Sequence, residues 1–143
     1  MSTGLPVFDA TIQDTNLWLK DLENRLGVSR HAAYAALRVT LHVLRDRLPP
    51  QTALHFADQL PLLLRGVFTE GWSLIDKPTG ERSLEAFLAR IEEGLPKGYP
   101  ADPGRVAQMV FQTLRARMDL GEIDKVIDHL PKPIARLWFE AIV

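Results

Sequence analysis

The sequence predicts an all-helical fold: a single compact bundle of about six to eight helices. Three observations support this fold class. Apolar residues recur at helical spacing along almost the whole chain, no long stretch alternates with period two, and prolines and glycines punctuate the pattern. A chain of 143 residues is long enough for one domain with its own core.

The first two helices have clear boundary signals. Residues 9–26 form an amphipathic segment that ends at Gly27, a typical C-terminal cap. Its apolar stripe contains Ile12, Leu19, Leu22 and Leu26, with Trp18 beside it. Ser29 is a suitable N-cap for a second helix, which runs to about Leu48. Apolar residues cover more than one face of that helix, so we expect it to be central.

Proline marks the next segment twice. Pro50 suits the first turn of a third helix, and Pro61 should kink or split it before the pattern resumes as far as Trp72. We expect the buried side before Pro61 to contain Leu54, Phe56, Ala57 and Leu60. Residues 73–82 combine Pro, Gly and mixed charge without a clear period, which predicts a connector.

The second half repeats this order. Ser83 should cap a short helix, and Asp102 followed by Pro103 is a strong start signal for a long one. Asp119 with Glu122 resembles a capping box for the next helix, and Pro131 should kink it. The inward residues of these helices include Phe87, Leu88, Ile91, Val106, Val110, Leu114, Ile123, Val126 and Leu130.

An internal repeat accounts for this order. Pairing residue n with n+70 needs no gap over residues 36–68, and six of the 33 pairs are identical. Apolar positions also stay in phase between the halves, and the first helices match when n is paired with n+69. We therefore expect residues 1–143 to form one domain from two pseudo-symmetric halves, about 9–72 and 83–143, joined by connector 73–82.

Composition limits the functional classes. The chain has 17 basic and 18 acidic residues, a net charge of −1, and no cysteine. Near-neutral charge makes nucleic-acid binding unlikely, and lack of cysteine removes disulfides and thiolate chemistry. No apolar run is long enough for a membrane helix and no secretory signal opens the sequence, so we expect a cytoplasmic protein without a membrane partner.

Residues that could act in catalysis or bind a metal or nucleotide show no recognisable motif. The four histidines, at 31, 42, 55 and 129, include no pair at helical metal-ligand spacing. Serines occur at a terminus, at caps or in the connector, and nucleotide fingerprints are absent. We expect no enzymatic activity, no catalytic residue, no metal site and no cofactor.

Repeated arginines are the first candidate site. Each half has two arginines near the end of its long helix and one aspartate further on. The matched positions are Arg45, Arg47 and Asp58, and Arg115, Arg117 and Asp128. An anion could bind the arginine forks, but duplicated acids favour duplicated structural salt bridges.

A second candidate is the end of the first half. Arg65, Gly71 and Trp72 precede the connector, where glycines and a proline predict mobility. This segment could meet a protein partner or a second copy of the chain, or Trp72 could simply close the core.

Several motifs resemble the bacterial domain of unknown function 2267 family. The similarity lies in residues 33–38, 44–49 and 59–61, then in Arg65-Gly66-Val67-Phe68 and Gly71-Trp72. It covers essentially the whole chain, although His129 replaces the glutamine of Gln59-Leu60-Pro61 in the second half. The resemblance implies an all-helical prokaryotic protein and brings no catalytic residues, since the family has no assigned activity.

The leading hypothesis is a non-enzymatic helical interaction or scaffold protein. An alternative is a carrier of a small apolar ligand, with a cavity between the two halves. Nucleic-acid binding through Arg38, Arg45 and Arg47 is the third hypothesis.

Overall fold

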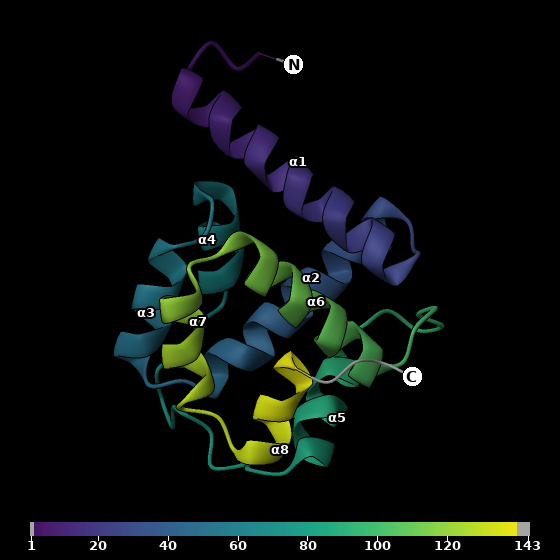
Figure 1. The fold of residues 1–143 in the computed structure, drawn as a ribbon, viewed down its shortest axis with the longest axis vertical. Coiled ribbons are helices and arrows are strands. Elements are labelled where there is room, and N and C mark those ends of the chain that lie inside the picture. Colours follow the sequence, from purple (N-terminus) through teal and green to yellow (C-terminus); the bar gives the residue numbers. More distant parts are fainter. Residues whose placement is uncertain (1, 140–143) are drawn as a thin grey trace.

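The protein is all-helical over residues 2–139, the part of the chain that the computed structural model describes (Figure 1). Eight α-helices and one 3-10 helix account for its regular structure, and no strand occurs in this range. The elements are α1 (Pro6–Leu26), α2 (Arg30–Asp46), α3 (Pro50–Asp58), α4 (Leu62–Thr69), α5 (Leu84–Gly94), α6 (Pro103–Arg117), α7 (Leu120–Ile127), α8 (Lys132–Ala135) and η1 (Arg136–Trp138). The predicted fold class is therefore confirmed. None of the helices described is both long and apolar enough to cross a membrane.

The predicted helix starts are confirmed by their caps. The side chains of four residues each accept a hydrogen bond from a backbone N–H three residues later, which satisfies a donor that the helix cannot use. These caps are Ser29 on α2, Ser83 on α5, Asp102 on α6 and Asp119 on α7. At Gly27 the backbone is left-handed, with φ of 68°, as predicted for the C-terminus of α1.

The two predicted kinks are full breaks. Pro61 and Pro131 have extended backbone angles and stand immediately before α4 and α8. Neither proline can continue the preceding helix, so α3 and α7 end and the chain starts a new helix in another direction.

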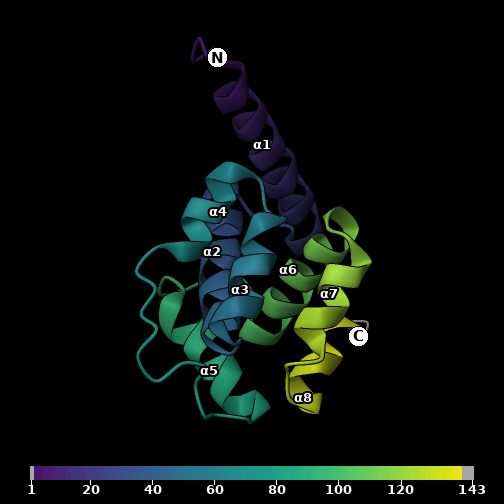
Figure 2. The same ribbon diagram turned by 90° about the vertical axis from the view of Figure 1, so that its left-hand side faces the viewer.

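Helices α2 and α6 form the centre of the bundle. Helix α2 contacts α1, α4, α5 and α6, and α6 contacts α1, α5, α7 and η1. Figures 1 and 2 show both helices enclosed by the others. The fully buried large side chains at this centre include Leu22, Leu37, Leu41, Leu44, Phe111 and Leu114.

Two expected core residues are exposed. Leu54 has an exposed fraction of 53%, because α3 packs on its neighbours through Ala53, Phe56 and Ala57 and Leu54 lies on another face. Ile12 is 37% exposed because it lies in the N-terminal half of α1, where the other helices cover the stripe only in part. Leu54 and Ile12 both belong to regular amphipathic patterns. Their exposure follows from the relative lengths and the placement of the packed helices, which the pattern does not show.

The bounds of the helices agree with the internal repeat. Helices α3 and α7 begin at Pro50 and Leu120, and α4 and α8 begin at Leu62 and Lys132, so both pairs keep the offset of the sequence repeat. The helix contacts also agree with the repeat, because the first helix of each half, α1 or α5, packs on both long helices, α2 and α6. The pseudo-symmetry of the halves stays a prediction that these matches support.

Helix α1 departs from this correspondence. When the first helices of the two halves are aligned, the start of α5 at Leu84 corresponds to Thr15, so residues 6–14 of α1 have no counterpart. We call residues 6–14 the arm. Figures 1 and 2 show the N-terminal part of the arm projecting beyond the rest of the molecule, while Thr11 of the arm contacts Leu63 of α4.

We predict that Gly94→Ala destabilises the protein because α5 approaches α2 closely at this residue. A Cβ atom at Gly94 would lie 2.8 Å from Cγ1 of buried Val39, a short branched side chain that cannot move aside. Overpacking of this kind costs about 1–3 kcal/mol. Chemical denaturation should show the loss.

The matched control is Gly66→Ala inside α4, where no heavy atom lies within 4 Å of the new Cβ. Alanine there should leave the unfolding free energy unchanged or raise it by up to about 1 kcal/mol, because alanine favours helix. Equal effects at both positions would contradict the close approach of α5 and α2.

Candidate functional site

Arg45 holds the end of α4 against α2. Its side chain is buried, with an exposed fraction of 5%. Its Nη1 donates hydrogen bonds to the carbonyl oxygens of Phe68 at 2.9 Å and Glu70 at 2.8 Å. Its Nε pairs with Asp46 at 3.0 Å, and its guanidinium lies 5.9 Å from the centre of the Trp72 ring. Arg45 thereby supplies donors to carbonyls that α4 leaves unpaired at its C-terminus.

Arg115 makes corresponding contacts in the second half. Its Nη1 donates to the carbonyl of Trp138 at 3.2 Å, and its guanidinium lies 4.9 Å from the centre of the Phe139 ring. The repeat pairs Phe68 with Trp138 and Arg45 with Arg115. In both halves, therefore, the arginine of the long helix donates to the carbonyl of the equivalent aromatic residue. Both arginines therefore have structural partners, mainly carbonyl groups.

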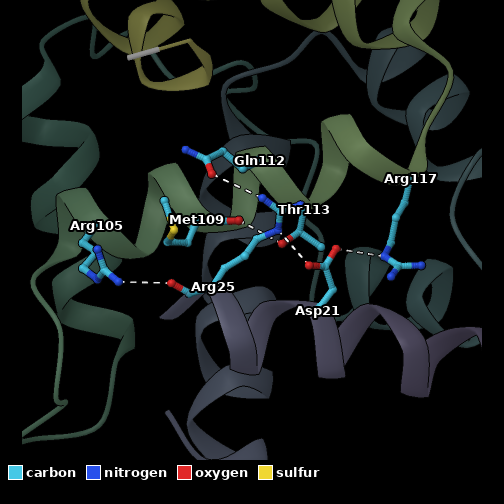
Figure 3. Close-up of polar contacts among 7 residues, drawn as sticks. All are labelled: Asp21, Arg25, Arg105, Met109, Gln112, Thr113 and Arg117. Atoms are coloured by element: carbon cyan, nitrogen blue, oxygen red, sulfur yellow. Dashed lines mark hydrogen bonds and ion pairs between the residues drawn. The ribbon is translucent and has the colours of Figure 1, made fainter. Parts of the chain in front are cut away.

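Arg47 and Arg117 connect other parts of the fold. The buried Arg47 donates to the carbonyl and hydroxyl of Thr79 and so ties the connector to α2. Arg117 on α6 pairs with Asp21 of α1 at 3.1 Å, and Asp21 also pairs with Arg25 at 2.8 Å (Figure 3). The contacts of Arg47 with Thr79 and of Arg117 with Asp21 join elements far apart in the sequence.

The predicted salt bridges to Asp58 and Asp128 require correction. In the described part of the chain, the carboxylates that pair with the four arginines are Asp46 and Asp21. Asp58 and Asp128 are exposed at the ends of α3 and α7. Arg45 and Arg115 instead face the carbonyl groups of helices that fold back along α2 and α6, which identity at a fixed offset could not reveal.

His42 completes the contact between α2 and α4. Its Nε2 lies 2.7 Å from the carbonyl oxygen of Val67. Burial lowers the pKa of His42, and the nearby Arg45 and Arg38 lower it further, against the opposing effects of the Val67 hydrogen bond and Glu70. A neutral imidazole with a proton on Nε2 fits this position as a donor to the carbonyl. His42 thus has a structural partner.

The predicted partner surface does not form one cluster. Arg65 lies against α3, with hydrogen bonds to the carbonyls of Ala57 at 3.3 Å and Asp58 at 3.4 Å. Trp72 is half-buried and packs on Phe68 and Arg45. Gly71 is exposed, with φ of 64°, a conformation that glycine adopts without strain. Trp72 therefore faces the core, and Arg65 borders a different surface on α4.

The surface that Arg65 borders is apolar, and it begins on the arm. The stripe of α1, extended to its N-cap Leu5, follows alternating spacings of three and four residues, at positions 5, 8, 12, 15, 19, 22 and 26, and all of these residues are apolar except Thr15. The last four of these residues are buried in the bundle. The first three extend past it and stay exposed: Leu5 by 50%, Phe8 by 47% and Ile12 by 37%.

The first turn of α4 extends the exposed stripe. The side chains of Leu62 and Leu63 are each 47% exposed. The backbone N–H of Leu63 donates to the hydroxyl of Thr11 at 2.9 Å, so the start of α4 lies against the arm. We call Leu5, Phe8, Ile12, Leu62 and Leu63 the arm face. The sequence pattern, continued from Ile12 back to Leu5, is enough to predict how far the stripe extends. Only the fold shows that no other helix covers this end of the stripe.

A groove of about 440 Å³ lies between α3 and α7. Its floor contains the buried Phe56 and Val126, and its rim includes His55, Lys125 and His129. The Nε2 atom of His129 is 3.2 Å from the hydroxyl of Thr52, which joins the two walls. The groove therefore combines an apolar floor with polar edges, contributed by both halves of the chain.

Fold and contacts together define an all-helical protein in which Arg45 and Arg115 each donate to a carbonyl near the end of a short helix, and whose first helix carries a projecting arm. The family described as "Uncharacterized conserved protein (DUF2267)" matches residues 15–137 of the chain. The chain belongs to this family. The match covers the helical body and begins at the residue that follows the arm. No curated protein matches the chain.

We predict that Arg45→Met lowers the unfolding free energy by about 2–3 kcal/mol, because it removes a charged donor from two carbonyls in a buried position. Arg38→Met is the control: Arg38 pairs with Glu70 at 2.8 Å, but both side chains are well exposed, so its loss should cost less than about 1 kcal/mol. Urea denaturation measures both. Equal, small losses would show that the Arg45 contacts are dispensable.

Proposed function

We propose that this protein is a non-enzymatic helical interaction protein whose arm face binds another protein. The observation that carries the proposal is the exposed apolar stripe on a helix that projects from the bundle (Figure 2). Contiguous apolar patches on a protein surface often mark interaction sites. Helices with apolar residues at this spacing commonly pack on a second helix or in a groove.

The energetic gain from covering the arm face is substantial. Complete burial of a Leu, Ile or Phe side chain contributes roughly 1.5–3 kcal/mol. The five residues of the arm face are about half exposed, so each would contribute about 1 kcal/mol on binding. This sum is large enough to offset part of the cost of association.

The arm is also held in a defined conformation before any partner binds. Asp9 accepts hydrogen bonds from the backbone N–H of Thr3 at 2.7 Å and from its hydroxyl at 2.9 Å, which closes the first turn. The Thr11 hydroxyl anchors the middle of the arm to Leu63. A preformed arm reduces the conformational entropy that binding must cost.

Nucleic-acid binding has less support. Of the three arginines that motivated it, Arg45 and Arg47 are buried and hydrogen-bonded, and Arg38 pairs with Glu70. A phosphate backbone would need accessible cations, and these three are already engaged. We infer a cytoplasmic protein, which the lack of cysteine in a chain of this length supports.

A small-ligand carrier is the second candidate, and the groove between α3 and α7 favours it. The volume of about 440 Å³ falls in the range of small-molecule sites. An apolar floor with histidine and lysine at the rim suits a ligand that has an apolar body and a polar end. This differs from the purely apolar ligand expected from the sequence.

The interaction proposal predicts that glutamates at both Phe8 and Ile12 abolish partner capture, because charge cannot be buried against an apolar surface without a large cost. Leu17→Glu is the matched control: Leu17 is 54% exposed on the same helix but on the side opposite the stripe. Affinity capture from a bacterial lysate with quantitative mass spectrometry should recover the same protein with wild type and control and lose it with the double variant. Identical recovery with all three proteins would reject the arm face as the binding site.

For the second candidate, native mass spectrometry should find a bound small molecule on the wild-type protein. His129→Trp should remove it by filling the groove, whereas His31→Trp, at an exposed position on α2, should retain it. A wild-type mass that equals the bare chain, together with no thermal shift across a small-molecule library, would refute the carrier role.

A further inference from the structure

We propose that the arm face binds the arm face of a second copy of this chain, with the two arms antiparallel. This inference rests on the proposed function and names its partner. The rest of the α1 stripe is already buried by the protein's own helices, so the arm face continues an existing packing seam beyond the body. An identical helix offers the same spacing in return.

The spacing of the arm face is self-complementary. Leu5, Phe8 and Ile12 occupy successive positions of a seam with alternating spacings of three and four residues. If two such helices run antiparallel, Leu5 of one copy meets Ile12 of the other and the two Phe8 residues meet at the centre. A two-fold axis then lies beside Phe8, which is the closed symmetry that most dimers have.

The exposed area of the arm face matches a weak, reversible dimer. A half-exposed large apolar side chain leaves on the order of 100 Å² uncovered. The arm face has five large apolar side chains that are 37–50% exposed, which gives at most about 500 Å² for one copy and about 1,000 Å² for a symmetric pair. Specific, stable interfaces bury about 1,200–2,000 Å² in total, and weak or transient ones bury less. We therefore expect a reversible dimer in the micromolar range.

Charge fits the antiparallel arrangement. Asp9 and Asp14 are the charged side chains that precede Lys20 in the sequence. Both oxygens of Asp9 are within hydrogen-bond distance of Thr3 or Ser2, so this carboxylate belongs to its own first turn. In the antiparallel pair, each acidic arm reaches toward the partner's α4, where Arg65 follows one turn after Leu62. Opposite charges then flank an apolar seam.

The arm lies outside the part of the chain that matches the family, which begins at Thr15. Three of the five residues of the arm face, Leu5, Phe8 and Ile12, therefore lie outside the matched range, whereas Leu62 and Leu63 lie on α4 within the shared helical body. Loss of the arm face should leave that body folded, because its core comes from other residues.

Sedimentation equilibrium of the full chain tests the dimer. Wild type and Leu17→Glu should dimerise with a dissociation constant in the micromolar range, and Phe8→Glu should raise that constant at least tenfold. Unchanged circular dichroism and melting temperature would show that Phe8→Glu still folds. A wild-type protein that stays monomeric throughout the micromolar range overturns self-association.

Cysteine crosslinking then tests the orientation, and the chain has no cysteine of its own to interfere. Under mild oxidation a mixture of Leu5→Cys and Ile12→Cys chains should form a disulfide-linked dimer, because the antiparallel arrangement places position 5 of one copy beside position 12 of the other. Leu17→Cys, on the opposite side of the helix, should remain monomeric. Crosslinking of Leu5→Cys or Ile12→Cys alone that equals crosslinking of the mixture would overturn the antiparallel arrangement.

These results separate the two proposals. If the wild type is monomeric but the lysate experiment still loses a captured protein with the double glutamate variant, the arm face binds another protein and only self-association is wrong. If wild type and variants behave alike in both experiments, the interaction function is wrong as well.

Discussion

Burial of the α1 stripe between α2 and α6 is the interaction on which the rest of the structure depends. Helix α1 brings Leu19, Leu22 and Leu26 into the core and contacts both long helices, one from each half of the chain. The polar edge of the same contact adds the pairing of Asp21 with Arg117 (Figure 3). Because one helix binds the two halves together in this way, its direction is fixed, and any part of α1 longer than the body must project into solvent.

In each half, an arginine hydrogen bond holds the short helix that follows the proline break. Pro61 and Pro131 free the chain to turn back, but the helices that follow are short and end with unpaired carbonyls. Arg45 donates a hydrogen bond to the carbonyl of Phe68, and Arg115 donates one to the carbonyl of Trp138. Each guanidinium also lies against a neighbouring aromatic ring. Burial of the Arg45 guanidinium would be costly if these donors were left unpaired, whereas Arg115 is only half-buried.

Local signals were enough to predict the helices, their caps and the two breaks, because each is set by residues within one turn. The repeated arginines were also recognised as structural candidates. Their partners could not be predicted from the sequence, because a guanidinium can pair with a carboxylate or a carbonyl, and only the packing of α4 on α2 decides. Leu54 and the arm face illustrate a second limit: an amphipathic pattern shows which residues share a face, not whether another helix covers it.

The proposed interaction follows from a mismatch of length. Helix α5 is long enough to cross the bundle and stops there, whereas α1 carries the same kind of stripe past the point where its own chain can cover it. Natural selection against exposed apolar surface would favour polar residues at such positions in a monomer. Two half-exposed leucines on α4 instead adjoin the arm, and Thr11 joins the two elements through Leu63. A rigid apolar surface built from two elements is more costly to leave exposed than a single side chain, and this cost is the physical basis of the proposed interaction.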